Sequence, residues 1–542
     1  MSTSDNRSFR LLPTVIHQCR RRRGGLKLAD STGAKLTGGE TLVRALVLRR
    51  ILRRHFLGED ERTIGVMLPS TVAGAVTNLA LALDKRVSVN LNFMLNQATL
   101  DQCVERAGLT HIITSRKVLE RLGMAQRPEH IILEDVPPLV GRRDKAICAA
   151  EGLAMPVEML VRRLGLDKSE PDELFSILFT SGSTGEPKGV MLSHHNVASN
   201  CGALRHGIDI RSTDVLVGIL PFFHAFGLTV SLWMPLVSDA TAVYHTSPLE
   251  AEHIGQITRD FGGTILVATP TFLRLFMARC TPEQFGSLNL VATGAEPLRR
   301  ELIDAFEARF GIRPFEGYGA TETSPAIAFN TPPERAPSHT HALLKEGTVG
   351  RPIQDVTIEI RDRETGRVLS PGVEGLVWVT GPNIMLGYLD DPARTAKVVV
   401  DGWYNTHDIG VLDEDGFLTI TGRVSQFSKI AGETVPHLLI ERAIAGLLGA
   451  GDADTPVVAV TATPDTRKGE RIVVVHTRIP MTGQEIGAGL REAGLPPLYI
   501  PSPDSFVEVD AIPVLPSGKV DLGAIRALAG ERFAIEPVTT GN

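Results

Sequence analysis

Short apolar runs alternate with amphipathic stretches along most of the chain before Gly350. The runs at 63–69, 111–115, 175–180 and 263–270 have the length and composition of buried β-strands. Each is followed by turn residues and then by a stretch with helical periodicity, such as PTFLRLFMARC at 270–280. This alternation predicts α/β layers with largely parallel strands.

The pattern changes after Gly350. The segments VTIEIRD, GLVWVTG and GFLTITGR are strand candidates separated by Gly, Pro and Asp turns, which predicts a small β-rich subdomain. From residue 424 onward, a helix candidate near 437–448, two strand candidates and the terminal helix candidate DLGAIRALAG predict a compact α+β unit. We therefore expect an α/β protein with two domains. The large N-terminal domain, 1–423, combines layered α/β subdomains with the β-rich subdomain, and the small α+β C-terminal domain covers 424–542.

Two segments raise the question of membrane contact. Residues 215–237 are about long enough to cross a bilayer, but two prolines, Pro221 and Pro235, interrupt them. We favour the interpretation that this segment forms a buried strand, a loop and a helix that touch an apolar ligand. The alternative is a membrane-embedded transporter. The arginine-rich stretch 42–56 has leucines at helical spacing, which favours a surface helix packed on the core over a helix that visits an anionic membrane surface.

Composition excludes several classes of protein. A chain of 542 residues is too long for one compact core. The formal net charge of -6 argues against a dedicated nucleic-acid binder. The 5 cysteines are dispersed without a CxxC pair, which suits a reducing cytosol better than a disulfide scaffold or a zinc site. We expect a cytoplasmic protein, with peripheral membrane contact left open.

The most informative stretch is FTSGSTGEPKGVMLSHHN, at 179–196. The run 175–180 predicts a buried strand, and Ser193 is a suitable N-cap for a following helix. The glycine-rich loop between them has the composition that presents N–H groups and hydroxyls to phosphate oxygens, and Lys188 adds a positive charge. The spacing matches neither Walker A nor G-x-G-x-x-G, so from the residues alone a flexible surface loop stays open.

The full string T-S-G-S-T-G-x-P-K-G resembles the signature of the adenylate-forming enzymes, a superfamily that includes acyl-CoA synthetases, luciferases and nonribosomal peptide adenylation domains. Further stretches resemble this superfamily in the expected order. They are PFFHAFGL, TGAEPL, EGYGATETSP, GTVGRP, GWYNTHDIG, TGRVSQFSKIAGE and LPSGKVD. The resemblance covers nearly the whole chain. Within the superfamily, the chain most resembles the acyl-acyl-carrier-protein synthetase domain of 2-acylglycerophosphoethanolamine acyltransferase/synthetase proteins.

This resemblance implies a reaction in two halves, with ATP and Mg²⁺ as cofactors. A carboxylate attacks the α-phosphate of ATP, and a thiol then displaces AMP from the acyl-adenylate. Both halves build negative charge on oxygen atoms, so the site must supply donors, a cation and a metal. The residues implied to hold the β- and γ-phosphates are Thr180, Ser181, Gly182, Ser183, Thr184 and Gly185, with Lys188 close by.

The resemblance also implies roles around the rest of the nucleotide. Thr321 would contact the α-phosphate, and Glu322 would hold Mg²⁺ as a hard oxygen ligand. Asp408, assisted by Arg423, would accept hydrogen bonds from the ribose, although the usual R-T-G-D pattern is replaced here by N-T-H-D. The residues implied to stack on or line the adenine are Tyr318, Gly319, Gly294, Ala295 and Glu296.

The C-terminal domain is expected to be mobile, because the implied adenylation lysine, Lys519, lies far along the chain from the phosphate loop. Ser425 stands where the family hinge residue is usually Asp or Lys. Lys429 and Gly432 would lie near the pantetheine path. The implied catalytic set is Lys519, Thr184, Glu322 and His224.

The substrate is inferred partly by exclusion. Amino-acid-activating relatives usually carry an Asp just after the Phe of the PFFHAFG region, whereas here His224 follows Phe223. A buried ammonium without a carboxylate would be costly, so amino acids are rejected and a medium- or long-chain fatty acid is expected. His224 would border the acyl pocket, or would be a hydrogen-bonded core histidine.

The acceptor is expected to be holo acyl carrier protein, with coenzyme A as the alternative, because both end in phosphopantetheine. Arginines at 20–23 and 49–54 would attract an acidic carrier protein. A non-catalytic acyl- or nucleotide-binding protein on the same fold is the rival hypothesis. His130 and Asp135 have the H-x-x-x-x-D spacing of an acyltransferase, which we attribute to coincidence.

Overall fold

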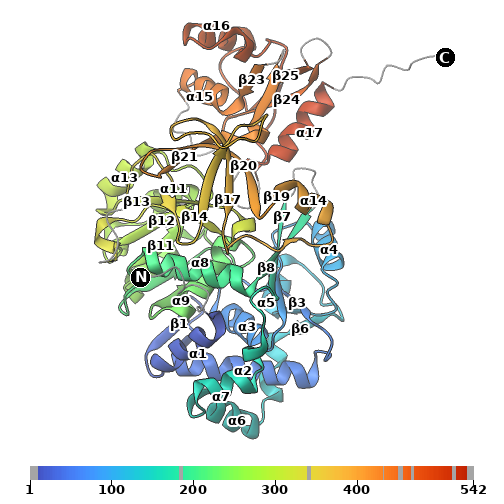
Figure 1. Ribbon diagram of the computed structural model, residues 1–542, viewed down its shortest axis with the longest axis vertical. Coiled ribbons are helices and arrows are strands. Elements are labelled where there is room, and N and C mark those ends of the chain that lie inside the picture. Colours follow the sequence, from blue (N-terminus) through green and yellow to red (C-terminus); the bar gives the residue numbers. More distant parts are fainter. Residues whose placement is uncertain are drawn as a thin grey trace, which may run out of the picture.

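The computed structural model describes residues 10–181, 187–337, 344–430, 433–449, 456–465, 469–514 and 520–533. In Figure 1 the C-terminal elements, coloured orange to red, stand above a larger body formed by the rest of the chain. Three sheets make up the larger body, and a fourth belongs to the C-terminal unit. This is the α/β fold class that the alternating pattern predicts, so that prediction is confirmed.

The largest sheet has nine strands in the order β15-β14-β13-β12-β11-β9-β10-β1-β2. Its strands are β1 (Leu26–Asp30), β2 (Lys35–Thr37), β9 (Val215–Gly218), β10 (Thr241–Tyr244), β11 (Ile265–Ala268), β12 (Leu290–Thr293), β13 (Pro314–Gly319), β14 (Ala326–Phe329) and β15 (Arg351–Pro352). All strands from β13 to β1 in this order are parallel. Their carboxyl ends therefore lie along one edge, where ligands commonly bind in such sheets.

A seven-stranded sheet has the order β18-β8-β7-β4-β3-β5-β6. Its strands are β3 (Thr63–Val66), β4 (Val87–Asn90), β5 (Ile112–Thr114), β6 (His130–Ile132), β7 (Leu174–Ser181), β8 (Pro187–Ser193) and β18 (Gly387–Tyr388). The strands from β6 to β7 are parallel, whereas β8 and β18 join antiparallel.

The β-rich subdomain is a five-stranded antiparallel sheet in which β20 is central. Its strands are β16 (Thr357–Arg361), β17 (Gly375–Thr380), β19 (Val399–Val400), β20 (Trp403–Leu412) and β21 (Leu418–Arg423). The C-terminal unit has β22 (Phe427–Ile430), β23 (Glu433–Pro436), β24 (Val458–Asp465), β25 (Gly469–His476) and β26 (Phe506–Glu508), covered by α15 (His437–Leu447), α16 (Gly483–Glu492) and α17 (Leu522–Arg532).

Helices cover the two large sheets and fill the space between them (Figure 1). They are α1 (Leu11–Arg21), α2 (Gly38–His55), α3 (Val72–Leu83), α4 (Gln97–Arg106), α5 (Arg116–Leu122), α6 (Arg142–Leu153), α7 (Val157–Arg163), α8 (His194–Gly207), α9 (Met234–Val237), α10 (Ala251–Phe261), α11 (Pro270–Arg279), α12 (Pro282–Phe285), α13 (Arg300–Phe310) and α14 (Pro392–Val398). The main apolar core joins side chains of α1, α2, α3 and α8.

The apolar segment 215–237 does not form one helix. It begins as β9, turns through a loop, and continues as a π-helix, η5 (Gly227–Trp233), followed by α9. Trp233 at the end of η5 is completely buried and lies 5.1 Å from the ring of Phe175 on β7. The favoured interpretation of a buried strand, loop and helix therefore describes this segment. Among the described residues, no helix is long and apolar enough to span a bilayer.

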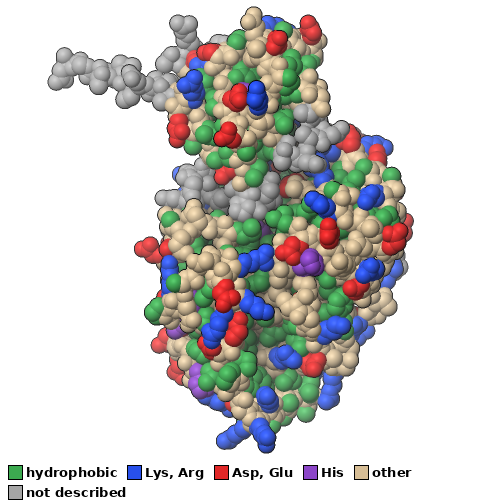
Figure 2. Space-filling model, turned by 180° about the vertical axis from the view of Figure 1, so that it is seen from behind, with side chains coloured by type: hydrophobic (Ala, Val, Ile, Leu, Met, Phe, Trp, Pro, Cys, Tyr) green, Lys and Arg blue, Asp and Glu red, His purple; other side chains and the backbone are tan. Residues whose placement is uncertain are grey.

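Most of the arginines near the N-terminus form ion pairs or hydrogen bonds within the protein. Asp84 pairs with Arg49 and Arg53, and Asp144 pairs with Arg50 and Arg54. The apolar side of α2 packs on α3 and α6, so α2 is a surface helix packed on the core. Arg20, Arg21 and Arg22 also have partners, which are the carbonyls of Glu151, Gly152, Ser212 and Leu26 and the carboxylate of Asp239. Figure 2 shows basic and acidic side chains interspersed over one face of the molecule.

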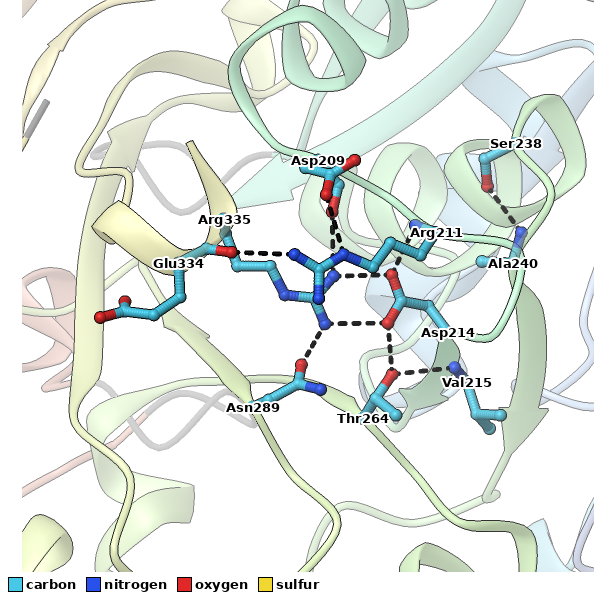
Figure 3. A network of polar contacts seen from close by, with 10 residues as sticks. All are labelled: Asp209, Arg211, Asp214, Val215, Ser238, Ala240, Thr264, Asn289, Glu334 and Arg335. Atoms are coloured by element: carbon cyan, nitrogen blue, oxygen red, sulfur yellow. Dashed lines mark hydrogen bonds and ion pairs between the residues drawn. The ribbon is translucent and has the colours of Figure 1, made fainter. Parts of the chain in front are cut away.

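A buried ion pair ties the loop before β9 to the segment after β14. The Arg335 guanidinium donates two 2.8 Å hydrogen bonds to the Asp214 carboxylate, and it also donates to Asn289 (Figure 3). Thr264 donates to Asp214 as well, at 2.8 Å. The side chains of Arg335 and Asp214 are only 1% and 2% exposed, so this pair is part of the interior.

Candidate active site

The glycine-rich stretch stands in sequence between two paired strands. Strands β7 and β8 pair antiparallel, and Thr180 stands opposite Lys188. The predicted order of strand, loop and helix is therefore wrong: a second strand intervenes, because Val190 and Leu192 are buried against the sheet. Helix α8 begins after β8 and has Ser193 as its N-cap, as predicted. Gly182, Ser183, Thr184 and Gly185 lie outside the described residues, and so does the side chain of Ser181.

Lys188 on β8 meets Glu322, which lies in a 3-10 turn, η6 (Thr321–Thr323), just after β13. Lys188 Nζ is 4.0 Å from Glu322 Oε1 and 5.0 Å from the ring centroid of Tyr388. The Tyr388 hydroxyl donates a 2.8 Å hydrogen bond to the same Glu322 oxygen. The Lys188 ammonium, the Glu322 carboxylate and the Tyr388 phenol, which come from two sheets, are therefore in mutual contact.

Two asparagine side chains hold the segment that follows Glu322. The side-chain amides of Asn200 and Asn383 both donate to the carbonyls of Thr323 and Ala326, at 2.9–3.2 Å. These bonds hold the backbone on the C-terminal side of Glu322, while its side chain accepts from Tyr388. Thr321 lies in the same turn as Glu322.

Asp408 on β20 forms the second half of the site. It is 2% exposed. The Tyr318 hydroxyl donates to Asp408 Oδ2 and Arg423 Nε donates to Oδ1, both at 2.5 Å. Burial raises the pKa of Tyr318 well above its usual value, and the Asp408 charge adds to this effect. The Tyr318 hydroxyl therefore stays protonated and acts as a donor.

Tyr404 lies on β20, four residues before Asp408. It is buried, and desolvation raises its pKa, helped by the charges of Glu322 and Asp408. Its phenol therefore stays protonated. The chain has only 5 tyrosines, and Tyr318, Tyr388 and Tyr404 all gather here.

The described residues suit a phosphate and a hard cation. The Thr180 hydroxyl is buried and has no hydrogen-bond partner within the described chain, so it is available to a phosphate oxygen. Glu322 offers a carboxylate oxygen, the ligand type that Mg²⁺ prefers. Lys188 adds the positive charge that polyphosphates need. These donors fit the predicted Mg²⁺ and triphosphate.

The residues expected around the adenine lie at the carboxyl edge of the large sheet. Gly294, Ala295 and Glu296 follow β12, and Tyr318 and Gly319 are the last two residues of β13. Ala295 is exposed and has a left-handed φ of 73°. Glu296 accepts hydrogen bonds from the N–H and the hydroxyl of Thr271, and its Oε1 is buried without a partner in the described chain. A Cβ on Gly319 would lie 1.9 Å from the Pro325 carbonyl oxygen, and one on Gly294 would lie 3.3 Å from the Gly317 oxygen. Both glycines permit close backbone packing beside Tyr318.

His224 follows β9 at the same edge and is half-buried, 4.8 Å from the ring of Phe223. Phe223 packs edge-on against Phe93 at 5.2 Å, and Phe222 packs against Tyr244 at 5.4 Å. Phe222, Phe223 and Trp233 are all nearly inaccessible. These aromatic rings form core in this conformation, while His224 is half-buried, like Pro221 and Phe226 of the same motif.

The structure describes only part of the predicted C-terminal site. The backbone of Ser425 lies in a 3-10 turn, η8 (Val424–Gln426), and that of Lys429 lies in β22, but their side chains are not described. Gly432 and Lys519 lie outside the described residues. His130 and Asp135 do not pair: His130 accepts from the Arg127 N–H, and Asp135 pairs with Arg116, in keeping with a coincidental spacing.

Comparison with known proteins identifies the family. A family model of AMP-binding enzymes matches residues 16–389, which is more than half of the chain. The chain belongs to the AMP-binding enzyme family. It is 28% identical over 506 residues to a feruloyl-CoA synthase of Amycolatopsis sp, covering 91% of this chain and 95% of that protein.

Two solved structures share the fold of this chain. ATP-bound MatB from Rhodopseudomonas palustris superposes with a TM-score of 0.74 at 24% identity, covering 95% of this chain and 98% of that one. A Mycobacterium tuberculosis fatty acyl CoA synthetase gives a TM-score of 0.70 at 21% identity, covering 96% and 99%. These comparisons confirm the superfamily resemblance. The closer likeness to acyl-acyl-carrier-protein synthetases stays a prediction.

Sequence reasoning missed Tyr388, Tyr404, Asn200 and Asn383. Their signal was weak, because Asn200, Asn383 and Tyr388 lie outside the quoted motifs and Tyr404, although inside GWYNTHDIG, is not one of the residues to which the resemblance assigns a role. Tyrosine is scarce in this chain, and two of these positions are tyrosines that flank α14, one in GYLDDP and the other in GWYNTHD. Scarcity alone, however, cannot tell a buried core phenol such as Tyr244 from one that reaches a carboxylate.

Proposed function

We propose that this protein is an ATP-dependent acid–thiol ligase. It activates a medium- or long-chain fatty acid as an acyl-adenylate and then transfers the acyl group to a phosphopantetheine thiol. The observation that carries this proposal is that the Lys188–Glu322 pair and the Tyr318–Asp408–Arg423 group share one element, since Tyr318 lies in β13 and Glu322 in the turn directly after it. The first group suits phosphates and the second suits a ribose.

In the first half-reaction, a carboxylate oxygen of the acid attacks the α-phosphorus of ATP. The bond from this phosphorus to the bridging oxygen of the β-phosphate breaks, and pyrophosphate leaves. Lys188 and the Thr180 hydroxyl bind phosphate oxygens, and Asp408 accepts the ribose hydroxyls. Glu322 would hold Mg²⁺, which would neutralise further phosphate charge. Lys519, as predicted from its motif, completes the site from the C-terminal domain.

In the second half-reaction, the thiol sulfur attacks the acyl carbon and the bond to AMP breaks, while the thiol proton passes to solvent. We propose coenzyme A as the acceptor, with holo acyl carrier protein as the alternative. The arginines that would attract an acidic carrier protein already pair with Asp84, Asp144 and Asp239. That pairing weakens the charge argument for a carrier protein.

An aromatic carboxylic acid is the second candidate substrate. The identity with a feruloyl-CoA synthase extends over 91% of the chain, which favours an aromatic acid. The aliphatic choice rests on the apolar PFFHAFG region. The lack of an Asp after Phe223 argues only against amino acids, whose ammonium it would meet.

The test is acid-dependent exchange of label between pyrophosphate and ATP. Fatty acids of graded chain length and hydroxycinnamic acids are offered in parallel, and coenzyme A or holo carrier protein is then added to the best acid. We expect exchange with fatty acids and thioester formation with coenzyme A. Lys188→Ala should reduce exchange strongly. An absence of exchange with every acid would leave the non-catalytic alternative, and exchange confined to hydroxycinnamic acids would select the second candidate.

A further inference from the structure

A serine, a histidine and a glutamate outside the nucleotide site are joined by hydrogen bonds. Strands β1 and β10 run parallel with Asp30 beside Tyr244, so the next residues, Ser31 and His245, leave the sheet together. Ser31 Oγ lies 2.8 Å from His245 Nδ1, and His245 Nε2 lies 3.2 Å from Glu250 Oε2. A hydroxyl, a base and a carboxylate in this order are the groups that activate a serine nucleophile on several unrelated folds.

The protons of this group have one consistent placement. An ionised Glu250 only accepts hydrogen bonds, so the hydrogen of the neutral His245 ring lies on Nε2. His245 Nδ1 is then an acceptor, and the Ser31 hydroxyl donates to it. Burial lowers the pKa of His245, and the negative charge of Glu250 only partly opposes this effect. At neutral pH the ring is therefore a free base that faces the serine.

The serine is accessible, whereas the histidine is shielded. Ser31 is exposed in the turn between β1 and β2, and His245 is only 3% exposed. Glu250 also pairs with Arg121 of α5, whose Nη2 lies 3.5 Å from Glu250 Oε1. The His253 ring stacks on the His245 ring, with 5.8 Å between their centroids. A substrate can therefore approach the Ser31 oxygen while neighbouring side chains keep the base in place.

We propose that Ser31, His245 and Glu250 form a second catalytic site, which hydrolyses carboxylic esters without ATP. Ser31 is the nucleophile, His245 is the general base, and Glu250 is a positioning residue. Leu249, directly before Glu250 in sequence, is 63% exposed, which favours an ester with an apolar acyl chain. Within the described residues, the three side chains make no hydrogen bond or ion pair with the nucleotide site, so this inference does not rest on the proposed function.

The reaction proceeds in two balanced steps. The Ser31 oxygen attacks the carbonyl carbon of the ester, and its proton passes to His245 Nδ1. The bond from this carbon to the alkoxy oxygen breaks, and the leaving alcohol takes the proton from His245. A water molecule then gives a proton to His245 and attacks the acyl-serine, which releases the carboxylic acid and returns the proton to the Ser31 oxygen. An ester and water thus become an acid and an alcohol.

The test uses two probes in the absence of ATP and Mg²⁺. A fluorophosphonate labels an activated serine, since the serine oxygen bonds to phosphorus, fluoride leaves and the proton passes to the base. Peptide mass spectrometry locates the label, and p-nitrophenyl butyrate measures ester turnover. Ser31→Ala removes the nucleophile at an exposed position. Ser212→Ala is the matched control, because Ser212 is also exposed and lies in the turn before β9.

We expect the label on Ser31, and we expect Ser31→Ala and His245→Gln to lower ester turnover at least about tenfold, since general-base assistance is usually worth more than that. Ser212→Ala should match the wild type. Glu250→Asp, which keeps the charge, should retain more of the rate than Glu250→Gln. The absence of label on Ser31, or ester turnover that Ser31→Ala leaves unchanged, would overturn the inference.

Two further measurements keep the result unambiguous. If the buried substitution His245→Gln prevents folding, the position of the label and the rate of Ser31→Ala decide. Acid-dependent exchange between pyrophosphate and ATP should be the same in Ser31→Ala as in the wild type. Loss of exchange in that variant would show that the serine belongs to the ligase site and would overturn the proposal of a second site. Absence of exchange in the wild type would count against the ligase function alone.

Discussion

Replacing Arg335 with methionine would leave the Asp214 carboxylate buried without its guanidinium. The pair is fully enclosed, and Asp214 would keep only the Thr264 hydroxyl and the Arg211 N–H as donors. Desolvation raises the pKa of Asp214, but the hydrogen bonds from Arg335, Arg211 and Thr264 outweigh it and hold this pKa below its ordinary value. Without Arg335, the cost of burying the charge is no longer offset.

The expected loss of stability for Arg335→Met is about 3–5 kcal/mol, the usual cost of removing one partner from a buried pair. The unfolding entropy per residue implies that each kcal/mol shifts the Tm of so large a unit by roughly 1–2 °C, so the Tm should fall by roughly 3–10 °C. Because Asp214→Asn removes the uncompensated charge, the double variant Asp214→Asn/Arg335→Met should recover a measurable part of the loss.

Thermal and urea unfolding, followed by tryptophan fluorescence, measure these changes. Arg211→Met is the matched control, since Arg211 forms an exposed pair with Asp209 in the same network and should change stability by less than about 1 kcal/mol. If Arg335→Met were no less stable than Arg211→Met, or if the double variant were worse than Arg335→Met, the reasoning about an unpaired buried charge would be refuted.

Three further predictions concern the site and the core. Tyr388→Phe removes the donor to Glu322 and should raise the Mg²⁺ concentration for half-maximal exchange about tenfold, as loss of a partner behind a metal ligand usually does; equal Mg²⁺ dependence would contradict the predicted metal role of Glu322. Asp408→Asn should weaken adenosine binding about tenfold or more but leave 2′,3′-dideoxyadenosine unaffected; equal losses for both ligands would contradict the ribose contact. Burial lowers the pKa of Lys27 to about 8 from 10.5, so between these values the unfolded chain binds more protons and Lys27 makes stability rise with pH. Lys27→Met should remove this rise, seen as a difference between the two proteins in the free energy of unfolding from pH 7.5 to 10.

The alternating pattern predicts the α/β layers well, because parallel strands buried on both faces need continuous apolar runs such as ILVA in β11. The sequence does not predict the strand β8 after the glycine-rich loop, because this strand lacks such an apolar run. PKGVMLS contains polar residues and glycine, so it gives no clear strand signal, yet it pairs along its length with β7. Pairing between strands is a tertiary effect that a local pattern does not contain.

The site was predicted by motif, and its supporting side chains were not. Lys188, Glu322 and Asp408 belong to recognisable sequence motifs. Tyr388 contacts Glu322 through tertiary structure, since the Met385 N–H donates to the Glu322 carbonyl and β18 follows directly. The arginines of α2 also depend on distant residues. Their charge suggested attraction for an acidic carrier protein, but Asp84 and Asp144, distant in sequence, pair with them. Contacts between distant segments decide both cases.

Because Lys188, Tyr318 and Asp408 come from three separate sheets, a nucleotide that touches all three would act as a non-covalent cross-link between them. Binding at one hundred times the Kd adds about 2.7 kcal/mol to a state that requires all three sheets in place. The nucleotide-bound protein should then unfold more nearly in one cooperative step than the free protein. Substitutions deep in the packing between sheets, far from any ligand atom, would weaken nucleotide affinity by shifting one wall of the site relative to the others.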